Sequence, residues 1–354
     1  MFRLLQSLFS AAPGDSGKFD AAVMRGAIER VVRGTDPRLR MARHYQKKLW
    51  PAVERALEHV IALVDGLPPP VVIERRAFTA DPRLRALFAS SQQLREILSF
   101  GEELIHYRRR IGGGLPTDLY AVLRTERIEK AVLGVALEGN IIRRDVPQVT
   151  VNFQNHRIAF PTGSETKTRR EIKKRAFDYL IQTALERLVA ARASKQQLEQ
   201  QQRQLLQKKS KLTRSAKAGS EPATAPQATA TNTPAAIDRR LREIEAELVQ
   251  ARVGATSLED HLAKVVDILG EPENHLRLHR VSLTLDHMNV KVDQNASSNA
   301  ATLTFDEVLL GGKGRGITTL LIRFPSDELL PEPDFFDEAN RLLYLGGQPR
   351  LTTI

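Results

Sequence analysis

The sequence predicts a predominantly helical α+β protein, and three observations carry that prediction. Apolar residues recur at helical spacing over much of the first 110 residues and again over 169–212. Alternating apolar and polar residues, typical of strands, follow each of these regions. We therefore expect a helical N-terminal body with a small antiparallel sheet, a long coiled-coil-like helical arm, and a C-terminal α+β module with antiparallel strands.

Composition excludes several kinds of site and indicates a folded chain. The chain has 354 residues, of which 42% are hydrophobic, so it is long enough to bury a sizeable core. It has no cysteine, which excludes disulfides, thiolate nucleophiles and zinc sites built on cysteine. The longest clean apolar run, 132–137, is far shorter than the roughly 18 residues that span a bilayer. We expect a cytoplasmic chain without a transmembrane segment.

The first twelve residues leave one alternative open. They form a short amphipathic starter in which Gln6 and Ser7 interrupt an apolar region. The rival interpretation is an export signal, or an interfacial anchor made by Phe2, Leu5 and Phe9.

Residues 1–164 form the predicted helical domain with a small sheet. The phrase DPRLR occurs twice, and in each copy Asp36 or Asp81 suits an N-cap while the following proline suits the first helical position. We predict one helix from Asp36 to about Asp65 and another from Asp81 to the glycines at 112–114. Reuse of a helix start explains the repeat better than a duplication, because a solenoid needs about three stacked repeats.

The small sheet is predicted from alternation. Valines and phenylalanine alternate with polar residues over 149–153, and 154–156 separate them from the apolar residues of 158–160, which indicates a hairpin. Residues 131–137 are a third predicted strand, with 139–140 as its turn.

The arm is predicted as a long basic helix over 165–212. Thr168 and Glu171 fit a capping box, and apolar residues then recur every seven positions, convincingly only near the start. Residues 213–235 are rich in Ala, Thr, Ser and Pro, which predicts a disordered linker. A return coiled-coil helix over 236–253 should fold back on the arm. Its apolar face consists of Ile237, Leu241, Ile244 and Leu248.

Residues 254–354 are predicted to form an acidic α+β module. An initial helix is followed by strand-like runs over 276–292, 302–310 and 317–324, and a last amphipathic helix lies around 335–343. The apolar parity of the first run changes twice, which predicts bulges near Arg280 and at Asp286 and His287.

Charge is distributed unevenly along the chain. The net charge of +11 includes +10 from residues 165–217, which hold 15 basic and 5 acidic side chains, whereas residues 254–354 carry −6. An anionic partner would therefore meet the arm first. The candidate anion or nucleic-acid contacts are Lys167, Arg169, Arg170, Lys173, Lys174 and Arg175. A solvated helix face is the alternative, and we favour it because the two aromatic residues of this region, Phe177 and Tyr179, belong to the apolar face of the helix and are not available for base stacking.

Motifs for catalysis or cofactor binding are weak. The glycine-rich segment 311–316 lacks the Ser or Thr and the following helix of a phosphate-binding loop, so we interpret it as a hairpin tip, with a mobile basic tip as the alternative. We expect no cofactor and no metal, because Arg277 between two histidines would repel a cation. The weak candidate polar site consists of His275, His279, Asp286 and His287.

These patterns favour a non-catalytic interaction or scaffold protein built around the basic coiled-coil arm, with a protein partner or self-association through the coiled coil. The first alternative is a nucleic-acid-associated protein that binds the phosphate backbone through residues 167–217. The second is a hydrolase-like enzyme with a His/Asp site in the C-terminal module.

Overall fold

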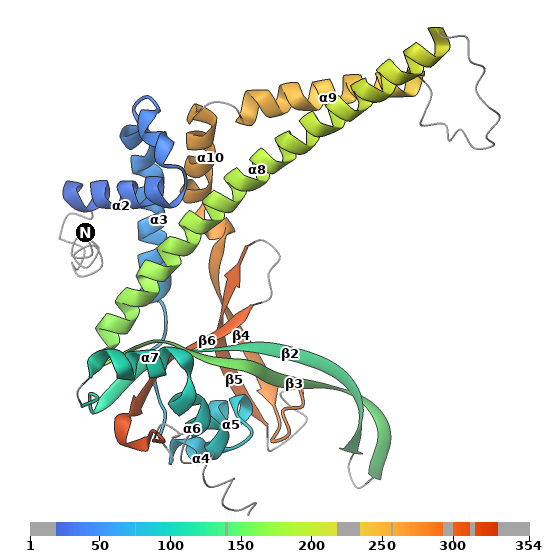
Figure 1. The fold of residues 1–354 in the computed structure, drawn as a ribbon. Coiled ribbons are helices and arrows are strands. Elements are labelled where there is room, and N and C mark those ends of the chain that lie inside the picture. Colours follow the sequence, from blue (N-terminus) through green and yellow to red (C-terminus); the bar gives the residue numbers. More distant parts are fainter. Residues whose placement is uncertain are drawn as a thin grey trace, which may run out of the picture. The chain divides into compact units, whose positions relative to one another are not determined.

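The computed structural model describes residues 19–74, 76–112, 114–138, 141–217, 234–255, 258–292, 300–311 and 316–331. The predicted α+β class, with a long helical arm and antiparallel strands, is confirmed (Figure 1). The chain divides into two compact units. We call residues 1–62 and 173–276 the helical unit, and residues 63–172 and 277–354 the sheet unit.

The helical unit is built from amphipathic helices with capped ends. Its elements are α2 (Ala21–Gly34), the 3₁₀ helix η1 (Pro37–Met41), α3 (Tyr45–Asp65), most of α8 (Glu165–Lys217), α9 (Pro234–Ala255), α10 (Leu258–Gly270) and η3 (Pro272–Asn274). Phe177, Leu180 and Ile181 on α8 are buried. Gly34 at the end of α2 lies against Ile181, whose Cγ2 would be 2.5 Å from an added Cβ. Only glycine permits this approach without displacement.

The DPRLR phrases cap two helices, as predicted. Asp36 accepts a hydrogen bond from the Arg38 backbone at 3.1 Å, and Asp81 accepts one from the Arg83 backbone at 2.8 Å. The predicted lengths were wrong, however. Asp36 begins only the short η1, and a separate α3 begins at Tyr45. A local cap fixes where a helix starts but not how far it runs.

The second predicted helix is three helices. They are α5 (Pro82–Leu87), α6 (Ser91–Phe100) and α7 (Glu102–Ile111), preceded by α4 (Ala77–Ala80). Ser90 starts α6, because its hydroxyl accepts a hydrogen bond from the Gln93 backbone, and Gly101 separates α6 from α7. The predicted glycine stop is confirmed at Gly112, which has the left-handed φ of 60°.

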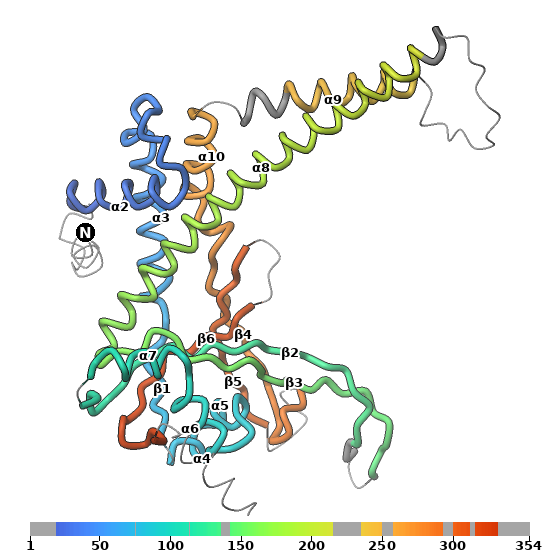
Figure 2. Tube along the Cα trace, in the orientation of Figure 1, coloured from blue at the N-terminus to red at the C-terminus, as the bar shows by residue number. Residues whose placement is uncertain are grey.

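The arm helix α8 begins at Glu165, as predicted, and ends five residues later than predicted, at Lys217. Thr168 does not cap it but lies inside its first turns, where the hydroxyl donates to the Tyr120 carbonyl at 3.1 Å. The return helix α9 lies beside the distal half of α8, and Figure 2 traces the two along each other. Its four predicted seam residues are buried, as is consistent with this pairing. They are Ile237, Leu241, Ile244 and Leu248.

The sheet unit holds one curled sheet that joins strands from both ends of the chain. Its order is β3-β2-β6-β5-β4, and β1 pairs parallel with β6. The strands are β1 (Val71–Val72), β2 (Asp118–Glu138), β3 (Ile141–Thr162), β4 (Leu276–Leu285), β5 (Ala301–Leu310) and β6 (Ile317–Pro325), followed by η4 (Ser326–Glu328). The sequence assigned these strands to two separate modules, whereas β2 and β6 are direct antiparallel neighbours.

The hairpin predicted over 149–160 was wrong. Residues 141–162 form the single strand β3, which pairs with all of β2, and the register shifts between Arg124 and Glu126. Asn155 has a φ of 57° at this irregularity. A β-bulge reverses the apolar parity just as a turn does, so alternation alone could not separate the two.

The run over 276–292 is likewise not one strand. β4 ends at Leu285, and Asp286 forms a tight turn by accepting hydrogen bonds from the Met288 and Val290 backbone. The chain then bridges to β3, where the Lys291 backbone donates to the Val149 carbonyl at 2.8 Å. The predicted irregularity at Asp286 and His287 is therefore a turn, and it closes the sheet between its edge strands.

The core of the sheet unit lies between the sheet and α4 to α7, which gather on one side of it (Figure 1). Alternate residues of β2, such as Leu119 and Leu123, are buried with Phe305 and Phe324 from the C-terminal strands. The helices add Leu84, Leu94 and Leu104. Burial of each such side chain contributes roughly 1.5–3 kcal/mol.

Several predictions fall outside the described residues. These are the N-terminal segment 1–18, most of the linker (218–233), the tip of the glycine-rich segment (312–315) and the last helix around 335–343. Residues 213–217, assigned to the linker, belong to α8.

Candidate interaction surfaces

The predicted basic cluster at the start of α8 is used within the sheet unit at Arg169. Its guanidinium donates to the Val64 carbonyl at 2.7 Å and to those of Leu67 and Pro68 at 3.2 and 3.1 Å. Glu165 lies 2.8 Å from its Nε. The Val64 carbonyl belongs to the last turn of α3, and those of Leu67 and Pro68 follow its end; a helix leaves its last carbonyls without intrahelical partners. Arg169 therefore caps α3.

The other members of the cluster vary in exposure. Lys167 and Arg175 are exposed, whereas Arg170, Lys173 and Lys174 are half-buried. The Nε atom of Arg170 is itself buried. Lys173, Lys174 and Arg175 each take part in interactions within the chain. The beginning of α8 therefore serves the fold as well as the surface.

A buried polar cluster in the helical unit joins η1, α8 and α10. The Asp36 carboxylate, 5% exposed, lies 2.5 Å from an Arg192 nitrogen and 3.4 Å from Nδ1 of His261. Burial alone would raise the pKa of Asp36, but hydrogen bonds from Arg38 and Arg192 outweigh it and lower that pKa to about 2. Burial, together with the nearby Arg192, lowers the pKa of His261. The ionised carboxylate of Asp36 thus connects η1, α8 and α10.

The weak candidate polar site is spread over different elements. His275 follows η3, the exposed His279 lies on β4, and Asp286 and the exposed His287 lie in the turn after β4. Asp286 uses its Oδ1 to form that turn. Burial lowers the pKa of His275, with a further contribution from Arg187. Within the described ranges, no three His, Asp or Glu side chains are grouped as metal ligands.

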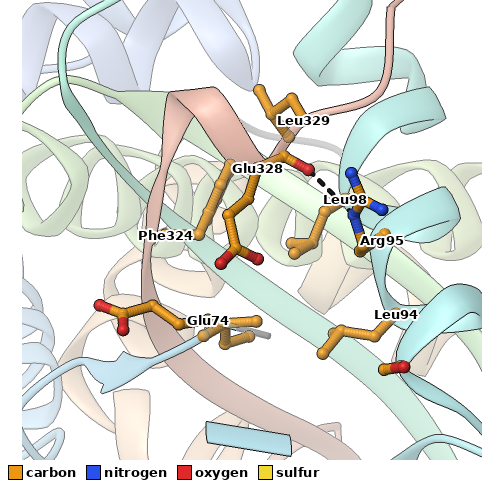
Figure 3. A pocket seen from close by; sticks show the side chains of 9 residues that line it. Glu74, Leu94, Arg95, Leu98, Phe324, Glu328 and Leu329 are labelled. Carbon is orange, nitrogen blue, oxygen red and sulfur yellow. Dashed lines mark hydrogen bonds between the residues drawn. The ribbon is translucent and has the colours of Figure 1, made fainter. Parts of the chain in front are cut away.

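A small cavity in the sheet unit lies between α6, β6 and the segment after it (Figure 3). Its volume is about 10 Å³, which is space for about one water molecule. Arg95 donates from Nε to the Glu328 carbonyl at 3.1 Å beside it. The cavity is therefore a packing gap and not a ligand site.

A larger open groove of about 590 Å³ lies along β3 in the same unit. Arg124 and Arg157 occupy opposite positions on β2 and β3 there. His156, also in the lining, donates from Nε2 to the Leu87 carbonyl at 2.8 Å and stacks on Phe88 with ring centroids 4.8 Å apart. Burial lowers the pKa of His156, against the opposing effect of that carbonyl. This histidine is thus held by the fold.

The distal part of the β2–β3 hairpin is the most exposed apolar surface of the described residues. β6 pairs with β2 only up to Glu126, and residues 290–291 flank β3 only as far as Val149, which pairs with Ala131. Beyond that point the hairpin is a two-stranded ribbon (Figure 1). Leu133, Val135 and Ile142 on this ribbon are 70%, 62% and 67% exposed. We call this surface the ribbon face.

The register places these three side chains on one face of the ribbon. The register shifts between Gly134 and Ala136, where two residues of β3, Arg144 and Asp145, stand against residue 135 alone. The extra residue is on β3, where Asp145 has a φ of 59°, so alternation continues along β2 and places Leu133, Val135 and residue 137 on one face. Ile142 pairs with residue 137 and shares that face. The opposite face is covered in part by Gln148, whose Oε1 occupies the space that a Cβ on Gly134 would need. The ribbon face was not predicted from the sequence, because an apolar run at strand spacing does not show which of its two faces packs against another part of the chain.

The distal end of the arm carries a second surface, of opposite character. Arg203, Lys208 and Arg214 on α8 and Arg239 on α9 are exposed. Arg203 lies 4.0 Å from Glu199, one turn earlier, with 77% of its side chain exposed, whereas Lys209 lies 2.6 Å from Asp238 and Arg240 lies 2.8 Å from Glu243. We call the four exposed cations the basic tip.

The fold and these surfaces define an α+β protein with a helical hairpin arm and a projecting β-ribbon. The chain matches no protein-family model, no curated protein and no solved structure. Each helix in the described part of the chain is too short or too polar to cross a membrane.

Proposed function

We propose that this chain is a non-catalytic interaction protein that self-associates through the ribbon face. The single observation that carries the proposal is the exposure of Leu133, Val135 and Ile142 on one face of the ribbon, beyond the last residues of β2 and β3 that another described strand or bridge flanks. Exposed apolar residues that occur singly need no explanation, but a contiguous group of them marks an interaction site.

The free strand edges support the same proposal. An isolated two-stranded hairpin is at best marginally stable in water, and strands with unpaired edges invite pairing with another chain. A partner that covered the ribbon face would remove apolar area from water at roughly 25 cal/mol per Å².

A second copy of this chain is the partner that the charges favour. The ribbon over 130–147 holds three basic residues, Lys130, Arg143 and Arg144, and two acidic ones, Glu138 and Asp145. It is therefore almost neutral in a chain of net charge +11, so two ribbons can approach with little repulsion. A two-fold contact would bury the same face on both copies.

The apolar seam between α8 and α9 offers little exposed surface for the self-association that its heptad pattern predicts. The apolar residues of α9 are already buried, Ile244 completely. Within the described residues, the ribbon face leaves more of its large apolar side chains exposed. No observation favours the hydrolase-like alternative, because its residues are not brought together.

The test is the molar mass of the full-length chain in solution. Light scattering on the eluting protein should show concentration-dependent association of the wild type, and Leu133→Lys with Ile142→Lys should give a monomer with unchanged circular dichroism. Met41→Lys, at an apolar position 70% exposed in the helical unit, is the matched control and should associate like the wild type. A wild type that stays monomeric at about 100 μM, a concentration at which interfaces of micromolar Kd are occupied, would contradict the proposal.

A further inference from the structure

We propose that the basic tip binds the phosphate backbone of double-stranded nucleic acid without sequence preference. This binding site goes beyond the proposed self-association and lies in the other unit. It lies at the opposite end of α8 from Arg169, whose guanidinium is occupied by backbone carbonyls at the end of α3 and just after it.

The distal end of α8 carries a concentrated positive charge. Residues 200–217 contain six basic residues and no acidic one, and Glu199 is the last carboxylate of α8. Arg203 and Arg214 are exposed, as is Lys208. At the start of α8, by contrast, Glu165, Glu171 and Asp178 lie among the cations. The potential is therefore most positive at the distal end of the arm.

Arg203 and Arg214 lie on the side of α8 that α9 does not cover. Leu198, Leu205 and Lys209 are half-buried and mark the side of α8 that faces α9. At 100° per residue, Arg203 and Arg214 project away from that side. They are eleven residues apart, or about 16 Å at 1.5 Å per residue. A duplex carries about ten phosphates over that length.

The side chains around the basic tip favour a nucleic-acid backbone over a lipid surface as the polyanion. Leu206 and Leu212, the partly exposed leucines of this region, lie about 120° apart around α8, so they do not form the continuous apolar face that inserts into a lipid surface. Residues 200–217 and α9 contain no aromatic residue on which bases could stack. Contacts of this kind reach phosphates alone and carry no sequence information.

The experiment measures fluorescence anisotropy of labelled DNA and RNA duplexes of mixed sequence with the full-length chain. The variant combines Arg203→Glu, Lys208→Glu and Arg214→Glu. The control combines Arg25→Glu, Lys47→Glu and Lys167→Glu, which changes the net charge equally at exposed positions elsewhere. Circular dichroism checks that both remain folded.

At about 150 mM salt, where long-range attraction is mostly screened, the wild type should bind with sub-micromolar Kd and equal affinity for unrelated sequences. The tip variant should lose at least tenfold, and its salt slope should fall by about 0.9 for each phosphate contact removed. Three results would overturn the proposal: no wild-type binding at this salt, an equal loss in the control, or preferential binding to phosphatidylserine vesicles that duplex does not displace. None of these results bears on the molar mass that tests self-association.

Discussion

The ammonium group of Lys209 lies 2.6 Å from the Asp238 carboxylate and joins the two helices of the arm near its distal end. The pair connects the distal end of α8 to the start of α9, and Ile237 and Leu241, one and three residues from Asp238, are buried. Both charged side chains are about half exposed, so the pair fixes register more than it adds stability. The stability of the hairpin must come from the buried apolar seam.

Charged substitutions in this seam should therefore detach α9. Leu241→Asp and Ile244→Asp each place a carboxylate at a position no more than 6% exposed, at a cost of several kcal/mol unless the helix separates. We expect the double variant to lose helical ellipticity at 222 nm and to be cut faster by protease within 234–255. Val249→Asp is the control, because Val249 on the same helix is 58% exposed. Equal behaviour of the double variant and this control would show that α9 is not packed.

Substitution of Arg169 should destabilise the fold. Arg169→Gln removes donors from the carbonyls of Val64, Leu67 and Pro68, and hydrogen bonds from a charged group contribute about 1.5–3 kcal/mol. We expect a loss of about 2 kcal/mol in the free energy of unfolding by urea. Lys167→Gln, at an exposed position two residues earlier, should change it little. A loss of nucleic-acid binding in a stable Arg169→Gln protein would restore the contact that the sequence predicted.

The stability that Asp36 contributes should disappear in acid. Its pKa is about 2 in the folded chain against an ordinary 3.8, so the unfolded chain binds the proton first as the pH falls. The contribution is therefore complete above about pH 4 and is lost as the pH falls toward 2, and it amounts to about 2 kcal/mol. Asp36→Asn should be less stable than the wild type at pH 7 by at least that amount. A gap between the two that stays constant from pH 7 to about pH 2.5 would contradict this account.

Local chemistry was predictable from the sequence, whereas long-range pairing was not. Asp36 and Asp81 cap helices because the cap depends on the next two or three residues. Ile237 and Leu248 are buried because a heptad face implies a partner helix. In contrast, Lys291 meets Val149 across more than 140 positions, and no periodicity encodes such a contact.

The basic tip and the ribbon face show the same difference between local features, which the sequence reveals, and long-range contacts, which it does not. The charges of the basic tip are evident in the sequence, but their exposure depends on which side of α8 is covered by α9. Leu133 and Val135 have the alternation of an ordinary half-buried strand, and they lie beyond both the pairing of β6, which ends at Glu126, and the bridge of residues 290–291 to β3. The role of Arg169 at the start of α8 was not predictable for the same reason, since the carbonyl groups that it caps lie about a hundred residues earlier.

The last prediction concerns His156, which links β3 to the end of α5. The ring donates from Nε2 to the Leu87 carbonyl, and burial lowers its pKa. A histidine with a lowered pKa stays neutral in the folded chain, so its contribution to stability is complete above the ordinary pKa of 6.5 and is lost as the pH falls through the folded value. Protonation would place a charge in the buried stack on Phe88.

We therefore expect the free energy of unfolding to fall between pH 7 and 5 more steeply in the wild type than in His156→Gln. At pH 7 this variant should be less stable by about 1 kcal/mol, because glutamine loses the stack but can still donate to the carbonyl. His287→Gln, at an exposed position in the same unit, is the control and should reproduce the wild-type slope. Urea unfolding at several pH values measures all three, and parallel curves for the wild type and His156→Gln would mean that His156 does not set the acid sensitivity of this unit.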